Sequence, residues 1–207
     1  MEIKKYLWRQ TYLSRIMGSV GSNLWRSFWI EDQDGQEVDL IRNGDLSCAL
    51  HISGVLLNLN PRSGSKAKFV SGPMTKVDQL HQDLLANGWE ELKFNGVESV
   101  QSGDVIFWEE LRGYNGREAG GPHGHCGFYI GEEKGISVIP RTGNPQIHDY
   151  LYRDQKDYIG NFEGRDQREI SLVLRCTKLL DSLPQPAASI KTDIDSLSYS
   201  IGMAQTQ

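Results

Sequence analysis

Cysteine and long apolar runs are both scarce in this chain of 207 residues. The three cysteines, Cys48, Cys126 and Cys176, are widely spaced, and no two of them form a C-x-x-C pair. Such spacing argues against a zinc knuckle, a thioredoxin-like redox site and a disulfide framework. No segment approaches the roughly 18 consecutive apolar residues that a membrane-spanning helix needs. We therefore expect free thiols and no transmembrane segment.

An excess of positive charge is also missing. The net charge is −5 and the isoelectric point is near 5.6, whereas a protein that binds nucleic acid needs a basic face. The sequence has no His-x-x-x-His pair and no cluster of carboxylates that would argue for a metal. It thus predicts no nucleic-acid partner, no metal and no cofactor.

The amino terminus lacks the apolar core of a secretion signal. Residues 1–5 resemble the charged start of a signal peptide, but Arg9, Gln10 and Arg15 interrupt the stretch that follows. We therefore expect a cytoplasmic location, with non-classical export or delivery by other machinery as the alternative.

Residues 1–30 differ in composition from the rest of the chain. They hold five lysines and arginines against a single glutamate, and three of the five tryptophans, namely Trp8, Trp25 and Trp29. A basic aromatic segment of this kind can lie on an anionic membrane or polymer surface. The interpretation that we favour is an N-terminal arm whose aromatic side chains pack on the main domain.

Helical patterns come next along the chain. Apolar residues recur at three- and four-residue spacing after a polar turn at Asn43-Gly44, which predicts a helix that ends at Asn60-Pro61. Asp45 or Ser47 can cap its start. A second helix is predicted over residues 75–87, where Asn87-Gly88 forms the stop.

From residue 100 the pattern changes to strands. Short runs rich in β-branched and aromatic residues predict strands at 104–108, 125–130, 136–139, 147–152 and 169–176. Helices followed by antiparallel strands make an α+β fold, which we assign to a domain over residues 31–182. The glycine-rich loop 109–124 is long enough for a lid or substrate wall, and residues 183–207 are predicted to be a mobile tail.

Cys48 and His125 carry the clearest chemistry in the sequence. The thiolate, not the thiol, attacks a carbonyl, and a free cysteine with a pKa of about 8.5 needs help to ionise at neutral pH. A helix start supplies part of that help through its dipole and its free N–H groups, which also stabilise an oxyanion. A histidine supplies the rest and then protonates the leaving amine. Cys48 at a helix start and His125 at the opening of a strand are placed for these roles.

Structural interpretations compete with the catalytic ones. A cysteine near a helix start is often a small buried apolar residue. Cys126 should point to the face of its strand opposite to that of the histidine before it, so we predict packing for it. His51, one turn after Cys48, is interpreted as a helix-face residue and not as the base. His123 in the glycine-rich loop and Trp108 are candidate substrate contacts, and a solvated loop histidine is the alternative for the former.

Three segments together resemble the NlpC-type and CHAP-type cell-wall peptidases and amidases. Residues 47–56 (S-C-A-L-H-I-S-G-V-L) look like the nucleophile helix of this superfamily, 102–108 (S-G-D-V-I-F-W) like its G-D strand, and 125–131 (H-C-G-F-Y-I-G) like its histidine strand. The likeness covers about residues 35–175 and looks closest to a group of uncharacterised NlpC-like proteins. It implies a papain-like fold in which the nucleophile helix packs on a curved antiparallel sheet.

The resemblance also implies a third site residue and a reaction. The family places a polar residue on the strand after the histidine strand, where it orients the imidazole. Ser137 falls near that position, His148 and Asp149 are candidates if the next strand folds beside the site, and Asn144 is a loop candidate. The implied function is a cysteine hydrolase that cleaves an amide bond in peptidoglycan peptides with a Cys-His dyad or triad. Acyl transfer or protein deamidation on the same fold, and a non-catalytic binding module, stay open as alternatives.

Overall fold

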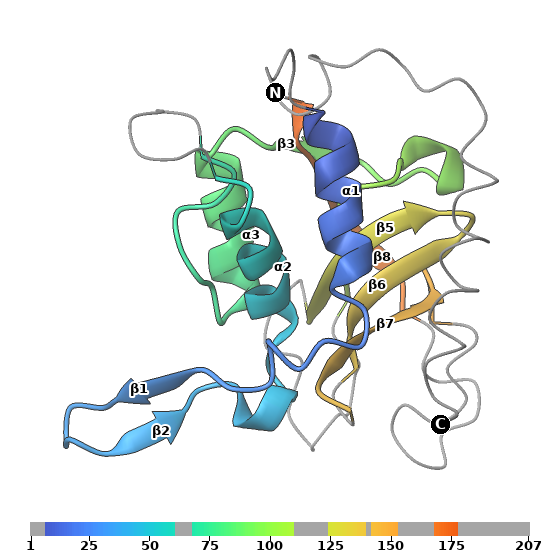
Figure 1. The fold of residues 1–207 in the computed structure, drawn as a ribbon. Helices are drawn as coiled ribbons and strands as arrows, with labels where there is room; N and C mark the ends of the chain where they lie inside the picture. The colour runs from blue at the N-terminus through green and yellow to red at the C-terminus, as the bar shows by residue number, and fades with distance from the viewer. Residues whose placement is uncertain (1–6, 61–67, 110–123, 140–141, 153–167, 178–207) are drawn as a thin grey trace, which may run out of the picture.

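The computed structural model describes residues 7–60, 68–109, 124–139, 142–152 and 168–177 (Figure 1). His123, nearly all of the loop predicted at 109–124 and the tail predicted at 183–207 lie outside the described residues. Within the described ranges no helix has both the length and the apolar character needed to cross a membrane.

A six-stranded antiparallel sheet in the order β3-β8-β4-β5-β6-β7 forms the centre of the molecule. Its strands are β3 (Glu90–Leu92), β4 (Val105–Trp108), β5 (His125–Gly131), β6 (Lys134–Ile139), β7 (Asn144–Asp149) and β8 (Ile170–Arg175). The described helices, α1 (Trp8–Gly18), α2 (Cys48–Leu57) and α3 (Val77–Ala86), lie to one side of it (Figure 1). This mixture of helices and antiparallel strands confirms the predicted α+β class.

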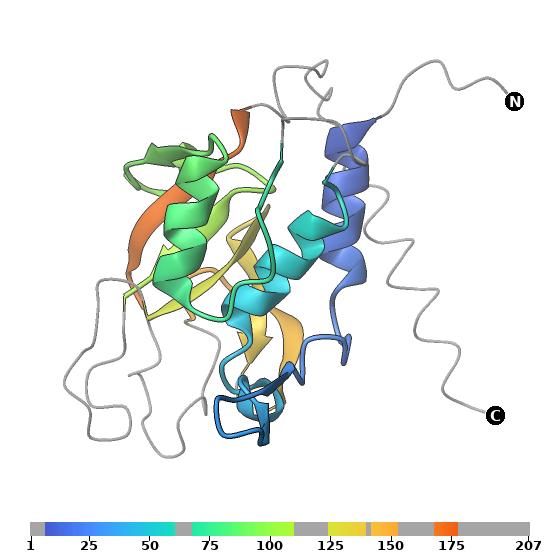
Figure 2. The same cartoon turned by 90° about the vertical axis from the view of Figure 1, so that its left-hand side faces the viewer.

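Helix α2 is the buried helix of the fold. Its sequence carries no charged side chain, and residues 49–56 are all buried, as expected for a helix that is apolar on every side. It lies between α1 and α3 in Figure 2, with the sheet behind it. Ala49, Ile52 and Val55 share one core cluster with Phe107 and Phe128 of the sheet. This packing fixes the direction of α2 and therefore the position of its first residue.

The sheet is covered on both faces. Cys126 and Phe128 face α2 and belong to the cluster just described, whereas Trp108 and Tyr129 belong to a second cluster on the opposite face. Neighbouring side chains of a strand point to opposite faces. His125 therefore lies on the face of Trp108, and Cys126 lies on the face of α2, as the sequence predicted for this pair.

An ion pair between Asp104, just before β4, and Arg175 in β8 joins these two neighbouring strands. The guanidinium of Arg175 in β8 donates to both carboxylate oxygens of Asp104, at 2.9 and 2.6 Å. The hydroxyl of Tyr12 in α1 donates to the carbonyl oxygen of Gly103 at 2.6 Å. Gly103 has a φ of 99°, a backbone conformation that favours glycine. Gly103 and Asp104 thus fasten helix α1 and strand β8 to the start of β4.

The amino-terminal segment is more regular than the sequence predicted. Residues 8–18 form helix α1, which we did not predict because only Tyr12 and Ile16 of its 11 residues are buried and the apolar spacing is weak. Trp8 and Trp25 pack against the core cluster of α2, which supports the packing interpretation for them. Trp29 is the exception, with 64% of its surface exposed.

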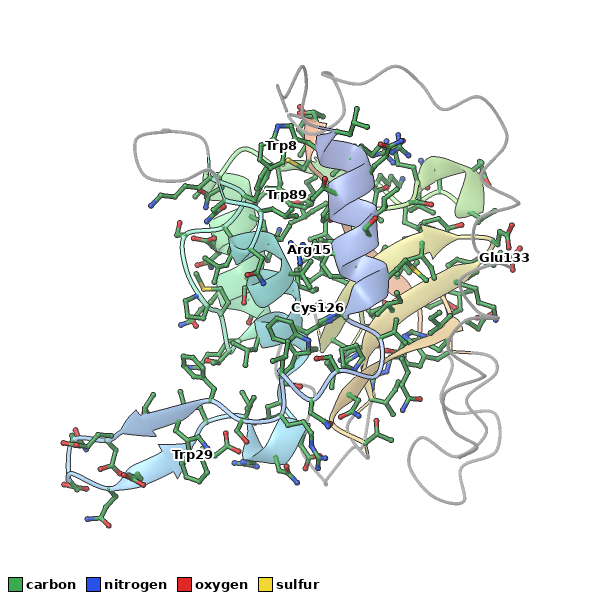
Figure 3. The ribbon with its side chains drawn as sticks, in the orientation of Figure 1. Trp8, Arg15, Trp29, Trp89, Cys126 and Glu133 are labelled. Atoms are coloured by element: carbon green, nitrogen blue, oxygen red, sulfur yellow. The ribbon has the colours of Figure 1, made fainter. Side chains whose placement is uncertain are left out.

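Trp29 belongs to a small hairpin that projects from the body of the molecule (Figures 1 and 3). Strands β1 (Trp29–Glu31) and β2 (Glu37–Asp39) pair with each other in a separate two-stranded sheet. At its base the carboxylate of Asp39 accepts hydrogen bonds from the backbone N–H groups of Phe28, Ile41 and Asn43. The hairpin therefore has its own local support and leads directly to the segment before α2.

The strand predicted at 147–152 begins earlier than expected. Strand β7 spans Asn144–Asp149 and pairs with β6 along its whole length, so the prediction of Asn144 as a loop residue is wrong. The sequence Asn144-Pro145 reads as a turn, but β7 is an edge strand of the sheet, where proline is tolerated because one side needs no N–H donor. This register brings His148 opposite Gly135 and Gln146 opposite Ser137.

Candidate active site

Cys48 is the first residue of α2 and is half-buried. The chain reaches it through the short 3-10 turn η1 (Arg42–Gly44). Gly44 has a φ of 99°, and a Cβ at that position would lie 2.5 Å from the Cα of Gly143 in the turn between β6 and β7. Only glycine fits this close approach of two backbones, which holds the start of α2 against the sheet.

The amino end of α2 has no side-chain cap among the described residues. Ser47 occupies the N-cap position, as the sequence predicted, but its hydroxyl donates back to the carbonyl oxygen of Gly44 at 2.8 Å. The first N–H groups of a helix have no partner within the helix. Those of α2 therefore lie beside Cys48 without a side-chain acceptor and can stabilise negative charge.

His125 is the first residue of β5 and is buried. It pairs with Trp108 across the β4–β5 ladder, and the two rings lie 5.5 Å apart between centroids. The ring of Tyr152 meets the imidazole edge to face at 5.9 Å. These aromatic contacts hold the imidazole in one plane.

Ser137 in β6 contacts the far nitrogen of this imidazole. Its Oγ lies 2.9 Å from Nε2 of His125 and 2.8 Å from Nε2 of His148 in β7. Gly127 makes room for this arrangement, because a Cβ there would lie 2.9 Å from the Cβ of Ser137 and 2.8 Å from the Trp108 ring. The structure thus brings His125, Ser137 and His148 together, while the backbone N–H of Asn144 donates to Oγ1 of Thr142 in the turn between β6 and β7.

The surroundings of Cys48 hold the pKa of its thiol well below the ordinary value. The largest contribution is a hydrogen bond with the Cys126 thiol; burial opposes it, and the charge of His125 and a hydrogen bond with that residue lower the pKa further. Burial and the contact with Cys48 raise the pKa of the Cys126 thiol well above its ordinary value. Cys126 therefore keeps its proton and donates it toward Cys48. Figure 3 shows Cys126 beside the end of α2 at which Cys48 lies.

The imidazole of His125 has a pKa below its ordinary value. Burial lowers the pKa of its imidazole below the usual 6.5, the thiolate of Cys48 raises it, and the positive charge of Arg168 lowers it again. Nε2 is engaged by Ser137, so Nδ1 is the nitrogen left for the hydrogen bond with Cys48. The pair has the connectivity of a nucleophile and its general base.

Trp108 has a different place from the one predicted for it. The sequence suggested a substrate contact, but the residue is fully buried and its indole N–H donates to the carbonyl oxygen of Tyr150 at 2.6 Å. A substrate has no surface of this side chain to touch, so we assign Trp108 to supporting the His125 ring.

His51 is a helix-face residue, as expected, and it is buried in the core. Its Nε2 lies 2.7 Å from the Oγ of Ser19 at the end of α1. No group of three or more His, Cys, Asp or Glu side chains among the described residues is placed to hold a metal ion.

Tyr152 and Arg168 are site residues that the sequence did not identify. The Tyr152 hydroxyl lies 2.5 Å from Oγ of Ser137, and the Arg168 guanidinium lies over the Tyr152 ring at 5.5 Å. Tyr152 follows the end of β7, and Arg168 precedes β8. Neither residue belongs to a motif, and only the fold shows that both reach the far side of the His125 ring.

The chain matches no protein-family model, and a search of curated proteins finds no similar sequence.

Proposed function

We propose that this protein is a cysteine hydrolase in which Cys48 is the nucleophile and His125 the general base. The observation that supports it best is the juxtaposition of three features at one point. A thiol with a lowered pKa begins a buried helix whose N–H groups have no side-chain cap, and a buried imidazole with Ser137 on its far nitrogen adjoins that thiol.

Acylation would follow from this geometry. The thiol proton passes to Nδ1 of His125 as the sulfur attacks the carbonyl carbon of an amide. The carbonyl oxygen takes up negative charge, which the free N–H groups at the start of α2 stabilise. The imidazolium then gives its proton to the leaving amine, the C–N bond breaks, and a thioester of Cys48 remains.

Deacylation uses the same base in the other direction. His125 removes a proton from water, the water oxygen attacks the thioester carbonyl, and the C–S bond breaks. The carboxylic acid leaves and the proton returns to the sulfur. A second acceptor in place of water would make the same site an acyltransferase.

We include the fold family and the substrate class in this proposal. A nucleophile helix against an antiparallel sheet, with the base on the sheet strand that follows the G-D strand, agrees with the NlpC-type resemblance of the three sequence motifs. That resemblance supports peptide amides of peptidoglycan as the substrate.

Alkylation of the thiol tests the catalytic pair. Cys126 and Cys176 are buried and Cys48 is half-buried, so iodoacetamide should label Cys48 first, at a rate above that of a free cysteine at pH 7. We expect the rate at Cys48, measured by peptide mass spectrometry, to fall about tenfold in His125→Ala, because the base that favours the thiolate is lost. The control His81→Ala changes a histidine of α3 that pairs with Glu91 and should leave the rate unchanged.

Digestion of muropeptides tests the reaction. Cleavage should give a free acid and a free amine, separated by mass, and Cys48→Ala should abolish both products. Products that carry a transferred acyl group would show transfer instead of hydrolysis. An unchanged digest with Cys48→Ala would overturn the proposal.

A further inference from the structure

Ser137 is the centre of a buried hydrogen-bond network with a fixed number of protons. Its Oγ contacts His125 Nε2 at 2.9 Å, His148 Nε2 at 2.8 Å and the Tyr152 hydroxyl at 2.5 Å. A serine hydroxyl has one hydrogen to donate and two lone pairs to accept with. Three contacts therefore use all of its hydrogen-bonding capacity, and it can donate its hydrogen to only one of the three neighbours.

The position of the hydrogen on His148 determines which neighbour accepts the hydrogen bond from Ser137. Nδ1 of His148 lies 2.8 Å from the carbonyl oxygen of Asp149, which can only accept, so Nδ1 carries a hydrogen. His148 is buried and stacked on the Tyr152 ring at 4.0 Å, and we take its imidazole as neutral, because a buried charge costs free energy unless it is paired. In a neutral imidazole with its hydrogen on Nδ1, Nε2 is an acceptor. The Ser137 hydroxyl therefore donates to His148.

In its two remaining contacts, Ser137 must then accept a hydrogen bond. Nε2 of His125 carries a hydrogen and donates it to Oγ, and the Tyr152 hydroxyl donates to the other lone pair. With its hydrogen on Nε2, neutral His125 has a bare Nδ1. That is the tautomer in which Nδ1 can take the proton of the Cys48 thiol.

The backbone at Tyr152 shows that this network is held at a cost. Tyr152 has a φ of 60°, a left-handed conformation that is a genuine outlier for a bulky residue and is strained. Its N–H donates to the same Asp149 carbonyl oxygen that His148 uses, at 2.8 Å. The turn thus places the phenol hydroxyl on Ser137 and the ring on His148 in one conformation.

We propose that His148 and Tyr152 are positioning residues that act through Ser137 to hold His125 with its hydrogen on Nε2 and Nδ1 bare. The third position of the site is then filled by a network and not by one side chain. This inference rests on the proposed function only for the role of the Cys48–His125 pair, because the proton positions follow from the hydrogen bonds and from a neutral His148 and not from the reaction.

The network makes a specific prediction for two histidines that share one serine. His125 should have its hydrogen on Nε2 and His148 should have its hydrogen on Nδ1. Long-range proton–nitrogen correlation spectra of the full chain with ¹⁵N-labelled histidine at pH 7 distinguish these tautomers directly, and single His→Gln variants assign the signals. Finding His125 with its hydrogen on Nδ1, or His148 doubly protonated, would overturn the proposal.

Two variants separate positioning from packing. His148→Phe keeps a ring against Tyr152 but removes the acceptor, so the Ser137 proton becomes free to go to His125. We expect mixed tautomer signals for His125 and an alkylation rate at Cys48 that falls by about tenfold, because the wrong tautomer cannot accept the thiol proton. Tyr152→Phe removes one donor only and should lower the rate by about threefold, in line with one hydrogen bond.

Tyr150→Phe is the matched control. It removes a hydroxyl from the same buried aromatic cluster, and none of the three hydrogen bonds of Ser137 involves it. Its tautomer signals and alkylation rate should equal those of the unmodified chain; equal losses in Tyr150→Phe and Tyr152→Phe would mean packing alone. If the spectra show the expected tautomers but muropeptides are not cleaved, the proposed reaction fails and the network stands.

Discussion

At the scale of single residues, the hydrogen bond with the Cys126 thiol makes the largest contribution to the lowered pKa of the Cys48 thiol. Cys126 lies on the α2 face of β5, next to His125 in the same strand. A buried S–H group that donates to sulfur stabilises the thiolate without taking part in the reaction. Cys126 therefore has a defined electrostatic effect in addition to its place in the core.

Replacing Cys126 by alanine should raise the pKa of the Cys48 thiol, because the donor that lowers it is lost. At pH 7 the fraction of thiolate falls, and we expect alkylation at Cys48 to slow by about threefold to tenfold, which lies within the range of one ordinary hydrogen bond. The measurement is the pH dependence of alkylation between pH 5 and pH 10, with Cys176→Ala as the control. A midpoint that stays in place would show that Cys126 only packs.

His51 couples the stability of the fold to pH. Ser19 donates its hydroxyl hydrogen to the carbonyl oxygen of Ile16 at 2.6 Å, so it accepts from Nε2 of His51. The ring is fully buried between Trp25 and Phe128. Burial, together with the nearby charge of His125, lowers the pKa of His51 from 6.5 to about 3.

The unfolded chain therefore binds a proton below pH 6.5 that folded His51 does not bind until about pH 3. The free energy of unfolding should fall as the pH falls through this window, by up to about 5 kcal/mol for the full difference in pKa. His51→Leu removes the titration, so its stability should depend less on pH there. Urea unfolding at several pH values measures both proteins, and parallel curves would contradict the assignment.

Some residues of the candidate site could be predicted from the sequence and others could not. Cys48 and His125 were predicted because each stands in a local motif, and Ser137 was predicted because a hairpin register can be counted. Tyr152 was not predicted, since a strained backbone after an edge strand has no sequence signal. The His148–Ser137 contact depends on the β6–β7 register. That register could not be predicted, because β7 begins at Asn144 and not at residue 147.

At the scale of elements, the packing of helix α2 requires glycine at position 54. A Cβ at Gly54 would lie 1.9 Å from the Trp25 ring, so glycine lets the chain before β1 pack on the helix. Glycine inside a helix costs about 1 kcal/mol relative to alanine. The packing of Trp25 offsets that cost and joins the amino-terminal segment to helix α2.

Gly54→Ala should therefore destabilise the protein despite the better helix propensity of alanine. Overpacking of this size costs about 1–3 kcal/mol, and the displaced Trp25 ring should shift the tryptophan emission. The matched control is Gly18→Ala at the end of α1, where a Cβ meets no atom within 4 Å. Stability that rises in both variants would show that Trp25 yields without cost.

The elements themselves were predicted where pattern and packing agree. Helix α3 buries one face, helix α2 is buried on all sides, and the strands from β4 onward are short runs of mostly buried residues, so each of them leaves a clear apolar pattern in the sequence. Helix α1 buries only two side chains, so its apolar pattern is too sparse to predict. Such elements form because the rest of the fold covers them, and a single sequence does not contain that information in local form.

At the scale of the whole molecule, charge is concentrated in the projecting hairpin. Residues 29–40 carry five carboxylates and no lysine or arginine, and the net charge of the whole chain is −5. Glu31 and Glu37 stand directly opposite each other across the hairpin, where like charges repel. The rest of the chain is therefore close to neutral, and the hairpin adds little packing to the body.

Shortening the hairpin should separate it from the site. Ile30 and Val38 are paired residues, so Asn-Gly in place of residues 31–37 gives a two-residue turn that suits a hairpin and removes four of the five carboxylates. Because Asp39 remains to hold the base, we expect the free energy of unfolding to change by no more than about 0.5 kcal/mol. The alkylation rate at Cys48 should stay the same, whereas retention on an anion-exchange column should fall. A slower reaction at Cys48 would instead mean that the hairpin helps to hold the turn η1, which leads from β2 to the start of α2.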